Sequence, residues 1–130
     1  MVPTGVLAPV KGTPFDFTTP YAIGKRIAQV PGGYDHNFVI DGEGLREHCR
    51  FTGASGLTLV LRSDAPALQV YTGEHLDGTV PGTSGVPYAR RAGVALEPQG
   101  FPDAPNHDNF PSTVLRPGEE YVTTTQWLVG

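Results

Sequence analysis

The sequence predicts an all-β fold of antiparallel strands joined by long loops, on two observations. Glycine and proline, which interrupt helices, are frequent and dispersed, with 17 glycines and 13 prolines among 130 residues. The longest run without either, residues 119–129, has only 11 residues and contains Thr123-Thr124-Thr125, which favours a strand. A mean helix of about 11–12 residues therefore has almost no place here.

The first half of the chain reads as short strands separated by turns. Residues 1–20 are rich in proline and extended, and the alternating residues 13–17 are expected at a sheet edge. Residues 21–30 form a short helical turn, which Pro31-Gly32-Gly33 ends. Strands are expected over residues 34–40, 45–52, 57–62 and 67–72, and their close spacing predicts an antiparallel meander. The leucines of the third strand are expected to face inward: Leu57, Leu59 and Leu61.

The second half contains longer connections. Residues 73–89 form a loop rich in glycine and proline, and long ordered loops in β proteins are often functional. A further strand begins at Val94, residues 116–119 (RPGE) form a type I or II turn, and residues 121–129 form the last strand. The length of the chain suits one domain or a piece of one.

The strand from Val94 holds the strongest candidate for chemistry. Val94 and Leu96 fall on one face and Glu97 on the other, so Glu97 is a carboxylate on a rigid element. Pro98 and the breakers after it are expected to end the strand and fix the loop that follows. Glu97 is therefore a candidate general base; the alternative is an exposed strand carboxylate beside a structural turn.

A second carboxylate, Asp35, stands at the mouth of a strand directly after Gly32-Gly33. Carboxylates of this kind can bind sugar hydroxyls, because both oxygens accept hydrogen bonds. The alternative interpretation is a turn or capping aspartate.

Charge and composition exclude several classes of function. Nine Lys and Arg against 13 Asp and Glu give a formal net charge of −4, which argues against a nucleic-acid or anionic-membrane partner. The four histidines show no metal-ligand spacing, so no metal or cofactor is expected. A single cysteine, Cys49, allows no internal disulfide, and no signal peptide or apolar run of about 20 residues is found. These features predict a cytoplasmic protein.

Four motifs then occur in a fixed order: GTPFDF, GGYDHNFVI, LQVYTGEHLDGT and GVALEPQGFPDAPNHDNFPSTVLRPGEEY. With them, residues 3–125 closely resemble the C-terminal part of the aldose 1-epimerases (galactose mutarotases). The resemblance implies that residues 1–130 form the C-terminal portion of a large twisted β-sandwich, the N-terminal part being absent. It also implies a reaction that interconverts the α and β anomers of a free aldohexose, such as galactose or glucose, by ring opening.

The resemblance assigns three residues. Glu97 matches the general base, Asp35 matches the aspartate that hydrogen-bonds sugar hydroxyls, and Gln69 matches a further sugar contact. The general-acid histidine, a second sugar-binding histidine and a sugar-binding arginine of the family lie N-terminal to this region. Loss of a positioned proton donor typically costs about 10²–10⁴-fold in rate.

Other side chains are expected to be structural. His36 is expected to support Asp35, His107 to be structural, and His75 and His48 to be exposed. Trp127 is expected in the core and Cys49 is expected to be buried. The Arg90-Arg91 pair is expected to be solvated or to contact a carboxylate.

Two alternatives remain at this point. In the first alternative, the chain is a non-catalytic sugar-binding or assembly module of the same fold. Its unpaired strand edges then predict self-association or a complementing N-terminal chain. The second alternative is a hexose-6-phosphate epimerase, a related enzyme that needs cationic groups for the phosphate; Arg90 and Arg91 are the adjacent cations.

Overall fold

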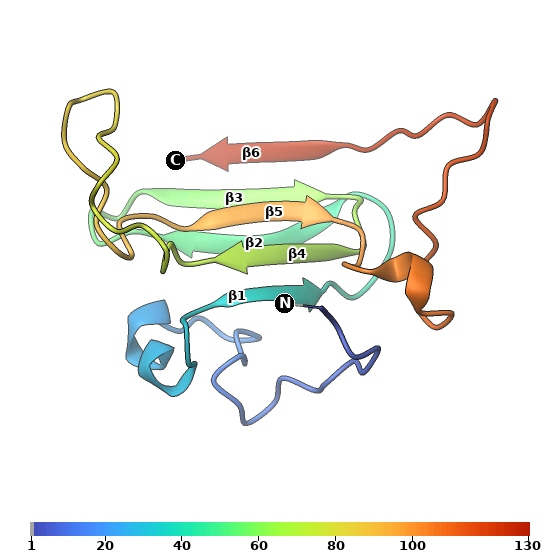
Figure 1. Cartoon of the computed structure of the whole chain (residues 1–130), viewed down its shortest axis with the longest axis horizontal. Helices are drawn as coiled ribbons and strands as arrows, with labels where there is room; N and C mark the ends of the chain where they lie inside the picture. Colours follow the sequence, from blue (N-terminus) through green and yellow to red (C-terminus); the bar gives the residue numbers. More distant parts are fainter. Residues whose placement is uncertain (1) are drawn as a thin grey trace. The chain divides into compact units, whose positions relative to one another are not determined.

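A computed structural model describes residues 2–130 and confirms the all-β class (Figure 1). The elements in chain order are the 3-10 turns η1 (Ile23–Lys25) and η2 (Ile27–Gln29), strands β1 (Asp35–Val39), β2 (Arg46–Thr52), β3 (Thr58–Ser63), β4 (Ala67–Tyr71) and β5 (Ala95–Gln99), the 3-10 turn η3 (Ala104–Asn106), and β6 (Thr125–Val129). In the described part of the chain, no helix is long and apolar enough to cross a membrane.

The predicted strands form, but the meander does not. β2 and β3 make an antiparallel hairpin, and β6 adds to β3 antiparallel, giving the order β2-β3-β6. The other sheet has the order β1-β4-β5, so β1 pairs with β4 and not with its neighbour in sequence, β2. The register of the hairpin shifts between Glu47 and Cys49, an irregularity that bends a strand locally.

The inward leucine pattern of β3 is only partly correct. Leu61 is fully buried, but Val60 on the opposite face is buried as well, so this strand is covered on both faces near its middle. Leu57 lies just before β3 and is 59% exposed. It closes the turn over residues 53–56, where the Gly53 N–H donates to Leu57 O at 2.9 Å.

The chain divides into two compact units. The first contains residues 1–6, 37–69 and 97–130; its buried cluster is Ala67, Phe101 and Ala104, with Phe110 packed against them. The second contains residues 7–36 and 70–96; its cluster is Ile27, Val30 and Tyr34, with Phe15, Phe17 and Ile23 packed against them. The loop over residues 73–89 contains no named strand, as predicted, and only an isolated bridge between Pro81 and Pro87.

Residues 13–17 were expected at a sheet edge, and this is wrong. Thr13 Oγ1 accepts the N–H of Phe15 at 3.1 Å, and Asp16 Oδ1 accepts the N–H of Thr18 at 3.2 Å. Short polar side chains that bond their own backbone favour turns over strands. Arg26 then donates to the Thr13 and Asp16 carbonyls, which ties these turns to η1 and η2.

The last strand is shorter than predicted. It begins at Thr125, and the two residues before it hydrogen-bond to Asp64, the residue that follows β3: the Thr124 carbonyl accepts the Asp64 N–H at 3.3 Å. Asp64 accepts from Thr123 Oγ1 at 2.7 Å, and both of its carboxylate oxygens accept from the N–H of Thr124 at 3.0 Å. The preceding turn is as predicted: Glu119 N donates to Arg116 O at 3.0 Å, and Gly118 has φ +89°, the type II geometry.

The hydrogen bonds of Thr123 and Thr124 to the Asp64 carboxylate predict that the stability of β6 depends on pH. The hydrogen bonds from Thr123, and then from Thr124, lower the pKa of Asp64 from its ordinary value of 3.8. Because the pKa of Asp64 is lower in the folded chain than in the unfolded chain, its carboxylate stabilises the fold fully at any pH above the unfolded pKa. This stabilisation is lost as the pH falls through the lower, folded-state pKa. We expect amide exchange of β6 to accelerate below about pH 4, relative to the β2–β3 hairpin, and Asp64→Asn to reproduce this near neutral pH. Equal protection of β6 in the variant would contradict the prediction.

Candidate functional site

Glu97 lies at the centre of β5 with its side chain exposed. No hydrogen bond or ion pair to its carboxylate is found among residues 2–130. β5 continues through Pro98 to Gln99 and ends before Gly100, the next of the predicted strand breakers. β5 is the last strand in the order β1-β4-β5, and an edge strand tolerates a proline that donates no ladder hydrogen bond. The backbone therefore holds Glu97 while its carboxylate stays open to solvent.

Gln69 lies on β4, the strand next to β5. Ala67 and Leu68 are buried before it, and Gln69 itself is half-buried. Gln69 and Glu97 both belong to the first unit. The structure therefore brings these two predicted residues onto neighbouring strands of one sheet, where polar side chains are held by a rigid backbone.

Asp35 is the first residue of β1 and belongs to the second unit. Its side chain is exposed, whereas the preceding Tyr34 is 1% exposed and anchors the segment. Gly32 and Gly33 have φ +80° and +69°, the left-handed region that glycine adopts without strain. Gly32 and Gly33 therefore form a turn with a defined backbone conformation directly before Tyr34 and Asp35.

His36 contacts the backbone of Asp35, the residue it was expected to support. The Asp35 N–H donates to His36 Nδ1 at 3.0 Å, and the His36 ring lies 4.7 Å from the Phe15 ring. Burial lowers the pKa of His36, against a smaller opposing effect of the Asp35 charge. A neutral imidazole that accepts at Nδ1 carries its proton on Nε2.

The other histidines have separate environments. His107 is structural as predicted: its Nε2 lies 3.5 Å from Asp103 Oδ2 and its ring packs on Phe110. His75 is exposed as predicted, and its ring stacks on Tyr71 at 6.2 Å. His48 was expected to be exposed but is half-buried on β2, and this burial lowers its pKa. In the described chain none of them forms an ion pair with Glu97.

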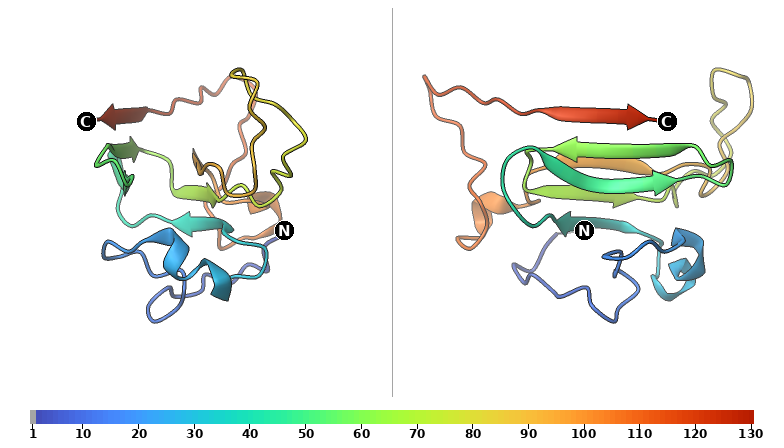
Figure 2. Two further views of the ribbon diagram at one scale, coloured as in Figure 1. Left: turned by 90° about the vertical axis from the view of Figure 1, so that its left-hand side faces the viewer. Right: turned by 180° about the vertical axis from the view of Figure 1, so that it is seen from behind.

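Two further predictions have different outcomes. Cys49 was expected to be buried but is only half-buried on β2. This partial burial, and then the charge of Glu47, raise the pKa of its thiol to about 11, so the thiol is protonated at neutral pH. Trp127 was expected in the core, but it is 52% exposed on β6. β6 is the last strand of its sheet and pairs with β3 (Figure 2). Like Trp127, every other residue of β6 is exposed.

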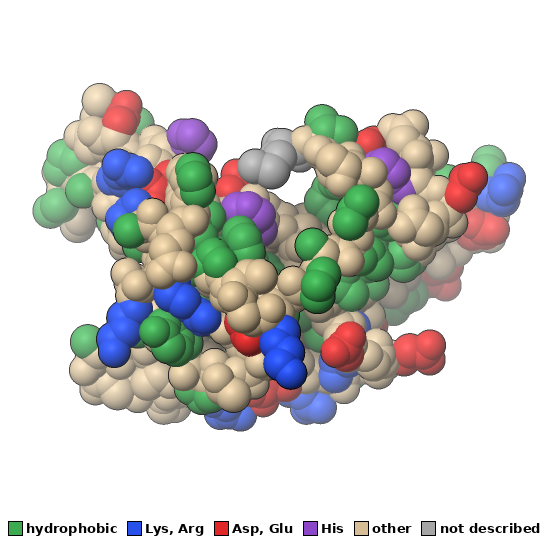
Figure 3. Space-filling view, turned by 90° about the horizontal axis from the view of Figure 1, so that it is seen from below, with side chains coloured by type: hydrophobic (Ala, Val, Ile, Leu, Met, Phe, Trp, Pro, Cys, Tyr) green, Lys and Arg blue, Asp and Glu red, His purple; other side chains and the backbone are tan. Residues whose placement is uncertain are grey.

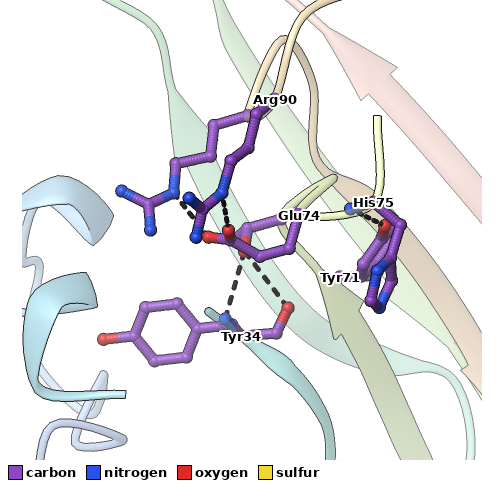
Figure 4. A network of polar contacts seen from close by, with 7 residues as sticks. Tyr34, Tyr71, Glu74, His75 and Arg90 are labelled. Carbon is purple, nitrogen blue, oxygen red and sulfur yellow. Dashed lines mark hydrogen bonds and ion pairs between the residues drawn. The ribbon is translucent and has the colours of Figure 1, made fainter. Parts of the chain in front are cut away.

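The sequence did not identify Glu74, the carboxylate on which the arginine pair leans. The Nε atoms of Arg90 and Arg91 both donate to its carboxylate, and only 3% of the Glu74 side chain is exposed (Figure 4). The sequence does show two adjacent arginines at the end of a long loop, which indicates a carboxylate partner. No sequence spacing identifies Glu74 as that partner.

Exposed hydrophobic side chains lie interspersed with charged and polar ones on the face in Figure 3. Among the residues that the structure describes, no three His, Cys, Asp or Glu side chains are grouped to hold a metal ion.

Comparisons with known proteins agree on one family. The family model described as aldose 1-epimerase matches residues 1–127. Galactose mutarotase of Homo sapiens is 43% identical over 128 residues, covering 96% of this chain and 37% of the relative. Aldose 1-epimerase of Escherichia coli is 37% identical over 137 residues, covering 97% and 39%.

A solved structure shares the fold. A GalM/aldose epimerase homologue from C. elegans superposes with a TM-score of 0.87 at 27% identity, covering 99% of this chain and 40% of that chain. The chain thus spans about two-fifths of the length of the proteins it matches.

Proposed function

The chain belongs to the aldose 1-epimerase family, and we propose that it supplies the general base and sugar contacts of a mutarotase acting on free aldohexoses such as galactose and glucose. The observation that carries the proposal is the exposed Glu97 carboxylate on β5, which has no partner among the described residues and lies next to the strand that holds Gln69. Both residues lie inside the region that the family matches.

Glu97 acts as the base in this proposal. Its carboxylate removes the proton from the C1 hydroxyl, the electron pair forms the C1 carbonyl, and the bond from C1 to the ring oxygen breaks as that oxygen takes a proton from an acid. Rotation about C1–C2 presents the other face of the carbonyl, and the reverse steps close the ring as the other anomer. An exposed carboxylate with no bound cation is free to accept this proton.

Asp35 and Gln69 act as binding groups. The Asp35 carboxylate accepts hydrogen bonds from sugar hydroxyls, while the Gln69 amide both accepts and donates them. The turn at Gly32-Gly33 and the buried Tyr34 fix the backbone before Asp35, and the buried Ala67 and Leu68 fix the backbone before Gln69.

We assign no general acid within this chain. We propose that the donor comes from the part of the family's length that this chain does not match, and that the reaction takes place in the cytoplasm.

Polarimetry tests the proposal. Freshly dissolved α-D-galactose and α-D-glucose are followed with the chain alone and with a separately produced N-terminal part of a relative. Acceleration above the buffer rate that needs both components supports the assignment. Mutarotation at the buffer rate in every mixture would show that the enzymatic interpretation is wrong.

One observation favours a second candidate, a non-catalytic assembly module. β6 exposes all five of its residues, including Trp127, Leu128 and Val129 at 52%, 51% and 65%. The strand carries no charge, proline or bulge that would protect its free edge, and such edges pair with other strands.

This edge predicts self-association of the isolated chain. We expect sedimentation velocity to show dimers or larger species whose fraction rises with concentration, because a second β6 can pair with the first. A lysine on an edge strand disfavours such pairing, so Leu128→Lys should shift the distribution toward monomer. A single monomer boundary for the parent chain at every concentration would exclude this interpretation.

A further inference from the structure

Glu74 is a buried carboxylate that two arginines neutralise, all within the second unit (Figure 4). Its side chain is 3% exposed, while those of Arg90 and Arg91 are 62% and 42% exposed. The hydrogen bond from Arg91, and then that from Arg90, lower the pKa of Glu74 against the effect of burial. The group is therefore a charged carboxylate enclosed beneath its cations, a costly arrangement unless both partners stay in place.

The backbone at Arg91, one of the two arginines, has an uncommon conformation. Arg91 has φ +65°, the left-handed region that residues with a Cβ seldom adopt. Its N–H donates to Gly73 O at 3.1 Å, and the Ala92 N–H donates to Ala89 O at 2.9 Å, which closes a turn around the arginine pair. Backbone strain of this kind persists only where the surroundings determine it, and here they direct both guanidinium groups onto Glu74.

The other side of Glu74 contacts the diglycine turn. A Cβ placed on Gly33 would overlap the Cγ and carboxylate of Glu74, so the Glu74 side chain lies directly on the Gly33 backbone. Tyr34 follows, and its N–H donates to Thr72 Oγ1 at 3.1 Å while its carbonyl accepts the Thr72 N–H at 2.9 Å. The segment that precedes Asp35 is thus fixed by Glu74 on one residue and by Thr72 on the next.

We propose that Glu74 is a positioning residue for sugar recognition: held by Arg90 and Arg91, it fixes the Gly33–Tyr34 backbone and thereby the place from which Asp35 presents its carboxylate. The proposal rests on the proposed role of Asp35 in binding sugar hydroxyls. Glu74 contacts the backbone and the arginines, and acts on the sugar only through Asp35. In this proposal the two arginines act as structural cations for Glu74.

The first test needs no ligand. Glu74→Gln keeps the shape of the side chain but removes the charge that holds both arginines. We expect amide exchange at Tyr34 and Thr72, measured by NMR on the full chain, to accelerate about tenfold. The matched control is Glu47→Gln, which breaks the exposed Glu47–Arg50 ion pair on β2 and should leave these amides unchanged. Unchanged exchange at Tyr34 and Thr72 in Glu74→Gln would overturn the proposal.

The second test measures coupling to Asp35. D-galactose is titrated into the parent chain, Glu74→Gln, Asp35→Asn and the double variant, with binding read from NMR shifts. We expect Glu74→Gln to weaken binding about tenfold when Asp35 is present and to add little in the Asp35→Asn background. Equal weakening in both backgrounds would overturn the proposal. All four titrations are made together with the N-terminal part of a relative. If the complemented parent chain binds no galactose, the proposed function fails, and the exchange experiment decides whether Glu74 positions the turn.

Discussion

Replacing Glu97 with glutamine is expected to slow mutarotation by the complemented chain about 10²–10⁴-fold, the usual contribution of a positioned general base. Glutamine keeps the size of the side chain but cannot take the proton from the C1 hydroxyl at neutral pH. No bond to the Glu97 carboxylate exists in the described structure, so the substitution breaks no network. The loss should therefore appear in kcat, with the melting temperature unchanged.

A control with the same chemistry is available at Glu120. This glutamate is exposed in the segment before β6, outside every strand, so Glu120→Gln changes the net charge equally without touching β5. It should leave the polarimetric rate at the parent value. A Glu97→Gln variant that retains the parent rate would show that the base is another residue.

The positions of the strands were predictable from the sequence, but their pairing was not. Alternation and turn residues located β1 to β5 to within a few residues, because these signals are local. The pairing of β1 with β4, and of β3 with β6, depends on contacts between distant parts of the chain. Close spacing alone suggested a meander, and only the β2–β3 hairpin conforms to it.

The candidate site divides in the same way. Glu97, Gln69 and Asp35 could be selected because each stands in a motif with neighbours on the chain. Glu74 could not be selected, because its role follows from contacts with Gly33 and Arg91, which are remote in sequence. Trp127 was misplaced for a related reason: residue type predicts burial only if another element covers the strand.

Gly33→Ala is expected to destabilise the chain by about 2–5 kcal/mol, from two separate effects. A left-handed backbone costs a residue with a Cβ about 1–2 kcal/mol, and Gly33 has φ +69°. Overpacking costs about 1–3 kcal/mol more, because the new Cβ meets a Glu74 side chain that two arginines hold in place. Urea unfolding of the parent and the variant measures the sum.

Gly32 separates the two effects. Its φ of +80° is equally left-handed, but apart from Gly32 and its two chain neighbours, no heavy atom of the described residues lies within 4 Å of where its Cβ would be. Gly32→Ala should therefore show only the backbone cost of about 1–2 kcal/mol. Adding Glu74→Ala should reduce the penalty of Gly33→Ala but not that of Gly32→Ala, because only the overlap is relieved. Equal penalties at both glycines would mean that Glu74 can move aside, and a side chain that moves freely cannot hold Asp35 in place.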